Sequence, residues 1–394
     1  MREAVIVAYG RSAIGKAPKG KLKYTRPADI ASQVVRGVLD KVPQLRCEEI
    51  DDLIIGCAFP EAEQGYNLGR IVALRSGLPN SVPGQTVNRF CASGIQTIAN
   101  GANSIIAGQA DVVLAGGVEF MGTVPMSGNI ITPNPYLMEN KPESYMSMGL
   151  TAEEVADRYK ITREMQDEFA VESHRKAHSA ILQGKFEDEI IPVEAIKPVM
   201  GDDGIIVNET FIFDKDEGVR GNTDIKGLGK LRTVFKVGGT VTAGNASQMS
   251  EGASMVLLMS KEKANSLGIK PIAKFLSYAV AGVAPEIMGI GPIRAIPKAL
   301  DLAGLKQDDI GLVELNEAFA SQAIACIDEL GLKPEIVNPN GGAIALGHPL
   351  GCTGAFLTGK LLSEMRREKI KYGVVSMCIG GGMGAAGVIE LMDM

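Results

Sequence analysis

The chain repeats one pattern of predicted secondary structure, and this duplication restricts its fold more than any other feature. An apolar helical stretch follows Cys91 and leads to a strand-like run at 111–117. A helical stretch also follows Cys352 and leads to a similar run at 372–378. The two cysteines lie 261 residues apart, and each strand begins about 20 residues after its cysteine.

A second pair of segments keeps nearly the same spacing upstream. A helical region from Pro27 leads to a strand at 49–56, and one from Pro292 leads to a strand at 308–316. Two copies of a strand–helix–strand–helix–strand pattern predict two similar βαβαβ halves of an α/β protein, packed in αβαβα layers.

The material between the copies, roughly 120–247, has no counterpart and is polar and irregular, with one amphipathic helical region at 151–183. We interpret it as an inserted loop domain that covers a site. The expected division assigns 1–119 and 248–270 to the first half, 120–247 to the insertion and 271–394 to the second half. A length of 394 residues with 45% hydrophobic content agrees with more than one ordinary domain.

Composition excludes several classes of protein. A net charge of −6 argues against a nucleic-acid partner. Residues 373–389 carry no charge but include six glycines, so we expect a buried strand–turn–strand and no membrane span. The six cysteines contain no C-x-x-C pair, so no structural zinc is expected. With a strand at 3–9 where a signal peptide would lie, these features favour a reducing, cytoplasmic compartment.

Cys91 is the first candidate for chemistry. Residues 92–110 carry no charge on any helical face, which predicts a helix buried on all sides and sandwiched between the sheets. Cys91 then lies at the helix N-terminus, where the dipole lowers the pKa of a thiol and favours the nucleophilic thiolate. The alternative is an inert buried cysteine.

Three further residues occupy positions suited to a site. His348 lies in a glycine-rich loop at 340–351, which lets the backbone approach a ligand closely. Cys378 follows an apolar strand and precedes a glycine turn that can present backbone N–H groups. Asn316 follows another apolar strand, so its amide needs a partner, either structural or catalytic.

Two other patterns are weaker. His174 and His178 have the i, i+4 spacing of metal ligands but no third ligand, and we expect a solvated helix face. Residues 382–387 match the dinucleotide pattern G-x-G-x-x-G, yet only seven residues follow, too few for the helix and strand that this motif requires.

Four motifs together resemble the thiolase family. They are Val87-Asn-Arg-Phe-Cys-Ala-Ser-Gly94, Asn316-Glu-Ala-Phe319, Gly347-His-Pro-Leu-Gly351 and Cys378-Ile-Gly-Gly-Gly-Met-Gly384. Their order agrees with the family over essentially the whole chain. The resemblance implies the thiolase fold and a coenzyme A (CoA)-dependent acyltransferase that cleaves or forms a carbon–carbon bond.

The resemblance also implies a role for each residue. Cys91 carries the acyl group, His348 takes its proton and later activates the CoA thiol, and Cys378 moves a proton on and off the acetyl α-carbon. His348 and a water held by Asn316 bind the enolate oxygen, while the N–H groups of Cys91 and Gly380 bind the oxyanion of the tetrahedral intermediate.

The segment 218–247 has the charge expected of a CoA-binding region. It carries Asp224 and five basic residues, namely Arg220, Lys226, Lys230, Arg232 and Lys236. An ordinary solvated loop would have the same composition. By the resemblance, Arg220 and Ser247 contact CoA, which enters as a substrate, with no permanently bound cofactor and no metal.

One position departs from the short-chain, acetoacetyl-type members, which carry His where this chain has Ser147. The departure favours a 3-ketoacyl-CoA thiolase of fatty-acid β-oxidation over an acetoacetyl-CoA thiolase. A ketoacyl-synthase-type enzyme and a non-catalytic acyl-CoA or lipid-binding protein share the fold, but Cys378 argues against the first. Intact Cys91, His348 and Cys378 argue against the second. A homodimer or homotetramer is expected, with a multifunctional β-oxidation protein as a further partner.

Overall fold

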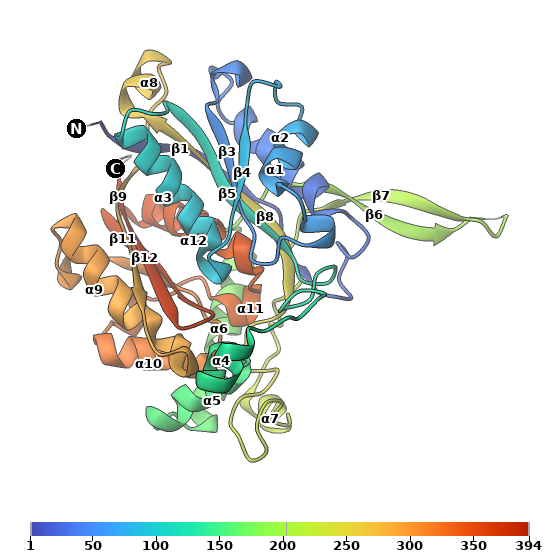
Figure 1. The fold of residues 1–394 in the computed structure, drawn as a ribbon, viewed down its shortest axis with the longest axis vertical. Coiled ribbons are helices and arrows are strands. Elements are labelled where there is room, and N and C mark those ends of the chain that lie inside the picture. Colours follow the sequence, from blue (N-terminus) through green and yellow to red (C-terminus); the bar gives the residue numbers. More distant parts are fainter. Residues whose placement is uncertain (1, 202, 393–394) are drawn as a thin grey trace.

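The computed structural model describes residues 2–201 and 203–392. One large sheet runs through the molecule (Figure 1). Its strands are β1 (Ala4–Arg11), β2 (Gly15–Lys16), β3 (Asp52–Gly56), β4 (Gly84–Val87), β5 (Val112–Phe120), β8 (Ser250–Ser260), β9 (Ala273–Gly282), β10 (Leu312–Leu315), β11 (Tyr372–Ile379) and β12 (Met383–Leu391). The order is β10-β11-β12-β9-β1-β8-β5-β3-β4, and β2 pairs with β8 outside this path.

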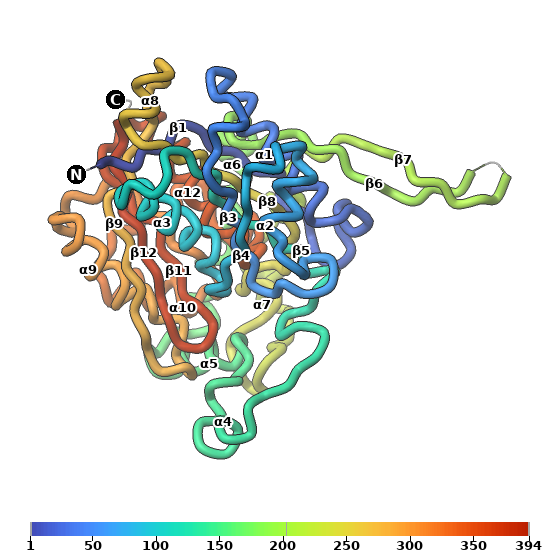
Figure 2. The backbone as a smooth tube through the Cα atoms, turned by 45° about the horizontal axis from the view of Figure 1, so that its top comes forward, coloured from blue at the N-terminus to red at the C-terminus, as the bar shows by residue number. Residues whose placement is uncertain are grey.

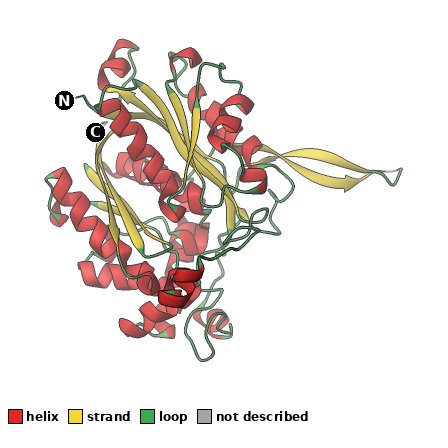
Figure 3. Ribbon diagram, in the orientation of Figure 1, coloured by secondary structure: helices red, strands yellow, loops and turns green. Residues whose placement is uncertain are grey.

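Helices cover both outer faces of the sheet and fill the space between its two halves (Figure 3). The bounds of the helices are α1 (Pro27–Asp40), α2 (Leu68–Arg75), α3 (Ser93–Ile106), α4 (Pro135–Asn140), α5 (Met148–Arg158), α6 (Arg163–Leu182), α7 (Ile225–Gly229), α8 (Lys261–Ser266), α9 (Gly291–Ala303), α10 (Ala320–Leu330), α11 (Ala343–Leu346) and α12 (Leu350–Glu368). The apolar cores fall into layers, with α3 and α12 in the middle, α1 and α2 on one side and α9 and α10 on the other.

The predicted fold class is confirmed, and both copies contain matching elements. In the first half β3 pairs in parallel with β5, and in the second half β10 pairs in parallel with β11. The halves do not form two separate sheets, because β1 and β9 pair at Val5–Lys274 and Ile6–Ala273. The uncharged stretch at 373–389 forms strand, turn and strand, as expected.

The two central helices approach each other through glycine. A Cβ placed on Gly94 of α3 would lie 2.7 Å from the backbone nitrogen of Ala355, and one on Gly354 of α12 would lie 2.2 Å from that of Ile95. Real Cβ atoms do not approach backbone this closely, so only glycine allows the observed contact. The first turns of α3 and α12 therefore lie against each other.

The inserted segment separates two neighbouring strands of the first half. β5 ends at Phe120 and β8 begins at Ser250, whereas in the second half a short glycine turn joins β11 to β12. On this topology we propose the division into 1–119 with 248–270, 120–247 and 271–394.

The helical region predicted at 151–183 is confirmed as helical, but a break divides it into two helices, α5 and α6. Lys160 adopts a left-handed φ of 58°, which ends the first helix. Thr162 then begins the second, because its side chain accepts a hydrogen bond from the N–H of Met165 at 3.2 Å.

A two-stranded ribbon, β6 (Val193–Met200) and β7 (Ile206–Phe213), projects from the body of the molecule (Figure 2). Within the described residues, no helix has both the length and the apolar character needed to cross a membrane.

Glu251 in β8 is a buried carboxylate in an unfavourable position. Its side chain is fully buried, and neither oxygen has a hydrogen-bond partner among the described residues. Burial, and then repulsion by Glu217, raise its pKa to about 7. Because this pKa lies above the ordinary value of 4.5 in the unfolded chain, the native state loses stability as pH rises from 4.5 to about 7, where the loss is complete.

We predict that Glu251→Gln increases thermal stability at alkaline pH alone. The neutral amide removes a charge whose burial costs on the order of 3 kcal/mol above pH 7. The melting temperature should rise by several degrees at about pH 8.5 and change little at about pH 4, where Glu251 is mostly protonated in both states. Calorimetry at the two pH values measures this, with the exposed Glu335→Gln as control. An equal shift at both pH values would contradict the electrostatic explanation.

Candidate active site

Cys91 lies where the sequence predicted, immediately before the buried helix α3. It occupies a single turn of 3-10 helix, Phe90–Ala92, and is 1% exposed. The adjacent Phe90 has a positive φ of 44°, which bends the chain between β4 and the helix. Cys91 and His348 line the same cavity, of about 540 Å³.

The expected lowering of the Cys91 pKa was wrong. Burial raises the pKa to about 12, while the backbone N–H groups of Gly380 and Cys91 itself act in the opposite direction. The helix N-terminus therefore does not produce a thiolate, because loss of solvation outweighs the backbone dipoles. At neutral pH Cys91 is a thiol and needs a base to become a nucleophile.

His348 is held on every side and remains neutral. Its backbone N–H donates to the Ser250 hydroxyl at 3.1 Å. In the ring, Nδ1 lies 2.6 Å from Oγ1 of Thr353, and Nε2 lies 3.3 Å from Nδ2 of Asn316. Burial lowers the pKa of the ring to about 4. A neutral imidazole at the wall of the Cys91 cavity can accept a proton.

Asn316 and Cys378 reach this region from neighbouring strands of the second half. Asn316 follows β10, and its backbone N–H donates to the carbonyl of Ser376 at 2.9 Å. Its Oδ1 is buried and accepts no hydrogen bond in the described part of the chain. Cys378 lies near the end of β11 and is fully buried. Burial, and then the charge of the nearby Cys91, raise the pKa of its thiol well above the usual range. This electrostatic effect indicates that the two sulfurs are close.

Gly380 begins the turn between β11 and β12. Gly381 and Gly382 have positive φ values of 81° and 84°, which other residues rarely adopt. The turn directs the Gly380 N–H toward the sulfur of Cys91. A backbone donor at this point is suited to bind an oxyanion that forms on a carbon attached to the sulfur.

Two cavities meet at Cys91. The cavity of about 540 Å³ contains His348, Arg220 and Ser247. The other, of about 510 Å³, has a largely apolar wall that includes Phe59, Phe90, Ile130, Ile131, Pro133, Met138, Met146 and Leu350. Cys91, Met148 and Leu350 line both, so one elongated ligand can pass the sulfur and occupy both cavities.

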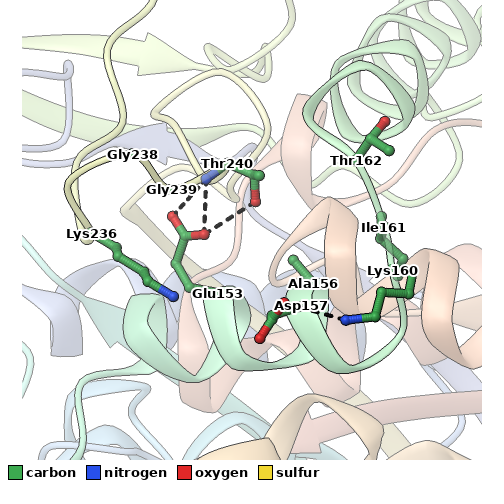
Figure 4. A pocket seen from close by; sticks show the side chains of 10 residues that line it. All are labelled: Glu153, Ala156, Asp157, Lys160, Ile161, Thr162, Lys236, Gly238, Gly239 and Thr240. Carbon is green, nitrogen blue, oxygen red and sulfur yellow. Dashed lines mark hydrogen bonds and ion pairs between the residues drawn. The ribbon is translucent and has the colours of Figure 1, made fainter.

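The basic segment contributes less to the site than its charge suggested. Of its five basic residues, Arg220 alone lines the Cys91 cavity within the described chain. Lys236 lines a separate pocket of about 430 Å³ (Figure 4). Ser247 lines the Cys91 cavity, and its N–H donates to the carbonyl of Ala318 at 2.9 Å.

Glu153 supports the loop that forms part of the cavity wall. Its carboxylate accepts a hydrogen bond from the N–H of Thr240 at 2.9 Å (Figure 4). It also accepts the N–H of Val241 at 2.9 Å. The loop continues to Thr242, which lines the Cys91 cavity. Helix α5 of the inserted segment thus fixes a loop in the wall of the Cys91 cavity.

The solvated face predicted for His174 and His178 is confirmed for His178, which is exposed, but was wrong for His174. His174 is 3% exposed, and its Nδ1 accepts the N–H of Arg220 at 3.2 Å. Burial, and then the charge of Arg220, lower its pKa to about 4. The residue supports the backbone at Arg220. Across the described residues, no group of three or more His, Cys, Asp or Glu side chains could hold a metal ion.

Three residues important to this geometry were missed by the sequence analysis. Thr353 contacts the His348 ring, Ser250 fixes its backbone, and buried Glu119 accepts the N–H of Gly351 at 2.9 Å. Thr353 lies five positions after His348, just beyond the glycine-rich loop. This closeness in sequence was the one signal that could have identified it. Nothing in the sequence connects Ser250 or Glu119 with His348.

The cavity brings together a cysteine at a helix N-terminus and a neutral histidine, on a duplicated five-layered fold. This combination is typical of an acyltransferase of the thiolase type. Residues 4–262 match the family model for the thiolase N-terminal domain, and residues 269–391 match that for the C-terminal domain. The chain therefore belongs to the thiolase family.

Similar proteins agree with this assignment. A 3-ketoacyl-CoA thiolase of Bacillus subtilis is 56% identical over 99% of this chain and 100% of its own length. The peroxisomal 3-ketoacyl-CoA thiolase B of Mus musculus is 47% identical, covering 98% of this chain and 90% of its own. The crystal structure of the Bacillus anthracis acetyl-CoA acetyltransferase superposes with a TM-score of 0.90 at 39% identity, covering 100% of this chain and 99% of the other.

Proposed function

We propose that this enzyme cleaves 3-ketoacyl-CoA with CoA, yielding acetyl-CoA and an acyl-CoA two carbons shorter, in fatty-acid β-oxidation. The observation that supports this most directly is that two cavities meet at Cys91, one with Arg220 and Ser247 in its wall and the other with a largely apolar wall. The names of the relatives, 3-ketoacyl-CoA thiolases from bacteria and mouse, agree with it. The reaction is reversible in principle.

In the first half-reaction, Nε2 of His348 takes the thiol proton of Cys91 while the sulfur attacks the 3-keto carbon. The N–H groups of Cys91 and Gly380 stabilise the oxyanion. The C2–C3 bond then breaks, leaving an acyl thioester on Cys91 and the enolate of acetyl-CoA. His348 and a water bound by Asn316 stabilise the enolate oxygen, and Cys378 protonates the carbon.

In the second half-reaction, CoA removes the acyl group. The proton that His348 took from Cys91 first passes to the Cys378 thiolate. His348 can then take the proton of the CoA thiol. The CoA sulfur attacks the thioester, the shortened acyl-CoA leaves, and Cys91 recovers a proton from His348. All protons balance over the cycle, so CoA is a substrate and the scheme uses no permanently bound cofactor.

We assign the cavity that contains Arg220 and Ser247 to CoA and the cavity that contains Ile131 and Met138 to the acyl chain. Arg220 supplies a positive charge for the polyanion, and Ser247 supplies a hydroxyl for its pantetheine arm. The apolar cavity offers side chains such as Ile131 and Met138 to an alkyl tail. Ser147 lines the cavity assigned to CoA. Its neighbour Met146 lines the cavity assigned to the acyl chain, and Met148 lines both.

We further propose that the chain forms a homodimer or homotetramer through the β6–β7 ribbon. A two-stranded ribbon is marginally stable by itself. Ile206 and Met200 are cross-strand partners, and they are 64% and 69% exposed. Ile212, on the same face by the strand alternation, is 57% exposed. A second copy of the chain would cover this apolar stripe. The same subunits could also accept a hydratase–dehydrogenase partner.

We place the enzyme in the cytoplasm. All six cysteines are free thiols, and five of them are buried. A reducing compartment keeps such thiols unpaired.

Acylation and α-proton exchange should separate the two cysteines. Incubation of wild type with acyl-CoA should add one acyl mass to the peptide that contains Cys91, and Cys91→Ala should remain unmodified. Cys378→Ala should still be acylated but should lose deuterium exchange at the α-carbon of acetyl-CoA, because it lacks the proton carrier. Mass spectrometry and NMR measure the two effects. An adduct in Cys91→Ala, or unchanged exchange in Cys378→Ala, would refute the assigned roles.

Chain-length preference should reflect the apolar cavity. Each buried methylene contributes about 0.8 kcal/mol, so two added methylenes should raise kcat/KM about fifteenfold over acetoacetyl-CoA. Met138→Trp should fill the cavity and remove this gain, whereas Tyr136→Trp, on the same helix but outside the cavity wall, should not. Ser147→His should reduce the difference in kcat/KM between the longer substrates and acetoacetyl-CoA. Steady-state kinetics with 3-ketoacyl-CoA of four to eight carbons measures this. A profile that peaks at acetoacetyl-CoA would instead assign a short-chain acetyltransferase.

The ribbon proposal predicts a change in subunit number. Met200→Glu combined with Ile206→Glu places two charges on the apolar stripe, so the assembly should become smaller by light scattering coupled to size-exclusion chromatography. Glu209→Gln, on the opposite face of the ribbon, should leave the mass unchanged. An unaltered mass in the double variant would exclude this interface.

A further inference from the structure

Thr353 makes the closest contact to the His348 ring. It lies in the first turn of α12, is fully buried, and places its Oγ1 2.6 Å from Nδ1 of His348. In the described part of the chain the hydroxyl has no other hydrogen-bond partner. It does not line the Cys91 cavity. The contact therefore acts on the histidine and not on a ligand.

We propose that Thr353 is a positioning residue, whose hydroxyl accepts the Nδ1–H of His348 and so presents an unprotonated Nε2 to the thiol of Cys91. The proposal rests on the thiolase reaction above, in which His348 is the base. It adds a residue that selects which ring nitrogen is basic.

The surroundings of the ring favour this tautomer. A neutral imidazole carries one N–H, on either Nδ1 or Nε2. The Nδ2 of Asn316 is a donor and lies 3.3 Å from Nε2, so an Nε2–H would set two donors against each other. With the proton on Nδ1, the Thr353 oxygen accepts it and Nε2 accepts from Asn316. Both ring nitrogens are then satisfied.

A hydroxyl at this place differs from a carboxylate in its effect on charge. A carboxylate would stabilise the imidazolium permanently and favour a resting thiolate–imidazolium pair. Thr353 is neutral, and burial alone lowers the pKa of His348, to about 4. The Cys91 thiol also stays protonated, since burial raises its pKa to about 12. The resting pair is neutral, and the proton moves only when the sulfur attacks.

During that step the contact with Thr353 strengthens. Nε2 gains the proton from the Cys91 sulfur, Nδ1 keeps its own, and the S–C bond forms as the carbonyl π pair moves to oxygen. The Nδ1–H of the resulting imidazolium is a charged donor, and hydrogen bonds to charged donors are stronger than neutral ones. The hydroxyl thus stabilises the transition state more than the ground state, which affects kcat and leaves KM unchanged.

Kinetics of two variants test this role. Thr353→Val keeps the shape of the side chain and removes the hydroxyl, so kcat should fall about 10–100-fold with unchanged KM. Thr353→Ser keeps a hydroxyl and should stay within about threefold of wild type. Equal kcat for the Val variant and wild type, or equal losses in Val and Ser, would overturn the proposal.

The tautomer itself gives a second test that does not depend on activity. The chain has three histidines, so a ¹⁵N-histidine NMR spectrum contains few signals, and His348→Asn identifies the His348 pair by its loss. Wild type and Thr353→Ser should carry the proton on Nδ1, and Thr353→Val should shift toward Nε2–H. A wild-type Nε2–H tautomer would refute the proposal. Failure of wild type to cleave any 3-ketoacyl-CoA would instead refute the proposed function, leaving the tautomer result valid.

Discussion

The close contact between α3 and α12 determines where the chemistry of this enzyme takes place. Cys91 immediately precedes α3, and His348 immediately precedes the Pro349 that caps α12. Gly94 and Gly354 bring the first turns of these helices into backbone contact. A side chain at either glycine would force the helices apart and separate Cys91, the proposed nucleophile, from His348, its proposed base. The site therefore depends on the absence of two Cβ atoms in the central layer.

The duplication explains why one site uses both halves of the chain. The first half provides Cys91, and the second provides His348, Asn316, Cys378 and Gly380. Glu119, at the end of β5, joins them, because its buried carboxylate accepts the N–H of Ala58 from the first half at 2.7 Å and that of Gly351 at the start of α12 at 2.9 Å. Burial raises the pKa of Glu119 above its usual value, and these backbone donors oppose the shift.

Burial decides the protonation states that the reaction starts from. It raises the pKa of the Cys91 and Cys378 thiols and lowers that of the His348 imidazole, so all three groups rest uncharged. A neutral resting site suits a bond-breaking step whose product is a carbanion, because no fixed charge opposes the enolate. Charge appears only as bonds change, next to N–H donors that are already oriented. The inserted segment completes the site by forming the walls of both cavities.

The sequence by itself determined the duplicated α/β halves, the insertion and the cysteine at the start of a buried helix, because apolar periodicity and glycine turns are local signals. Through the resemblance to thiolases it also predicted His348, Asn316, Cys378 and Gly380 as site residues, since each lies in or beside a short contiguous motif. Tertiary structure alone decided that burial outweighs the helix dipole at Cys91, that His174 is enclosed, and that Thr353 and Ser250 hold His348. Tertiary structure also decided that two cavities meet at Cys91. Solvation, cavity shape and contacts between segments more than two hundred residues apart depend on how the layers pack, and no local pattern encodes that packing.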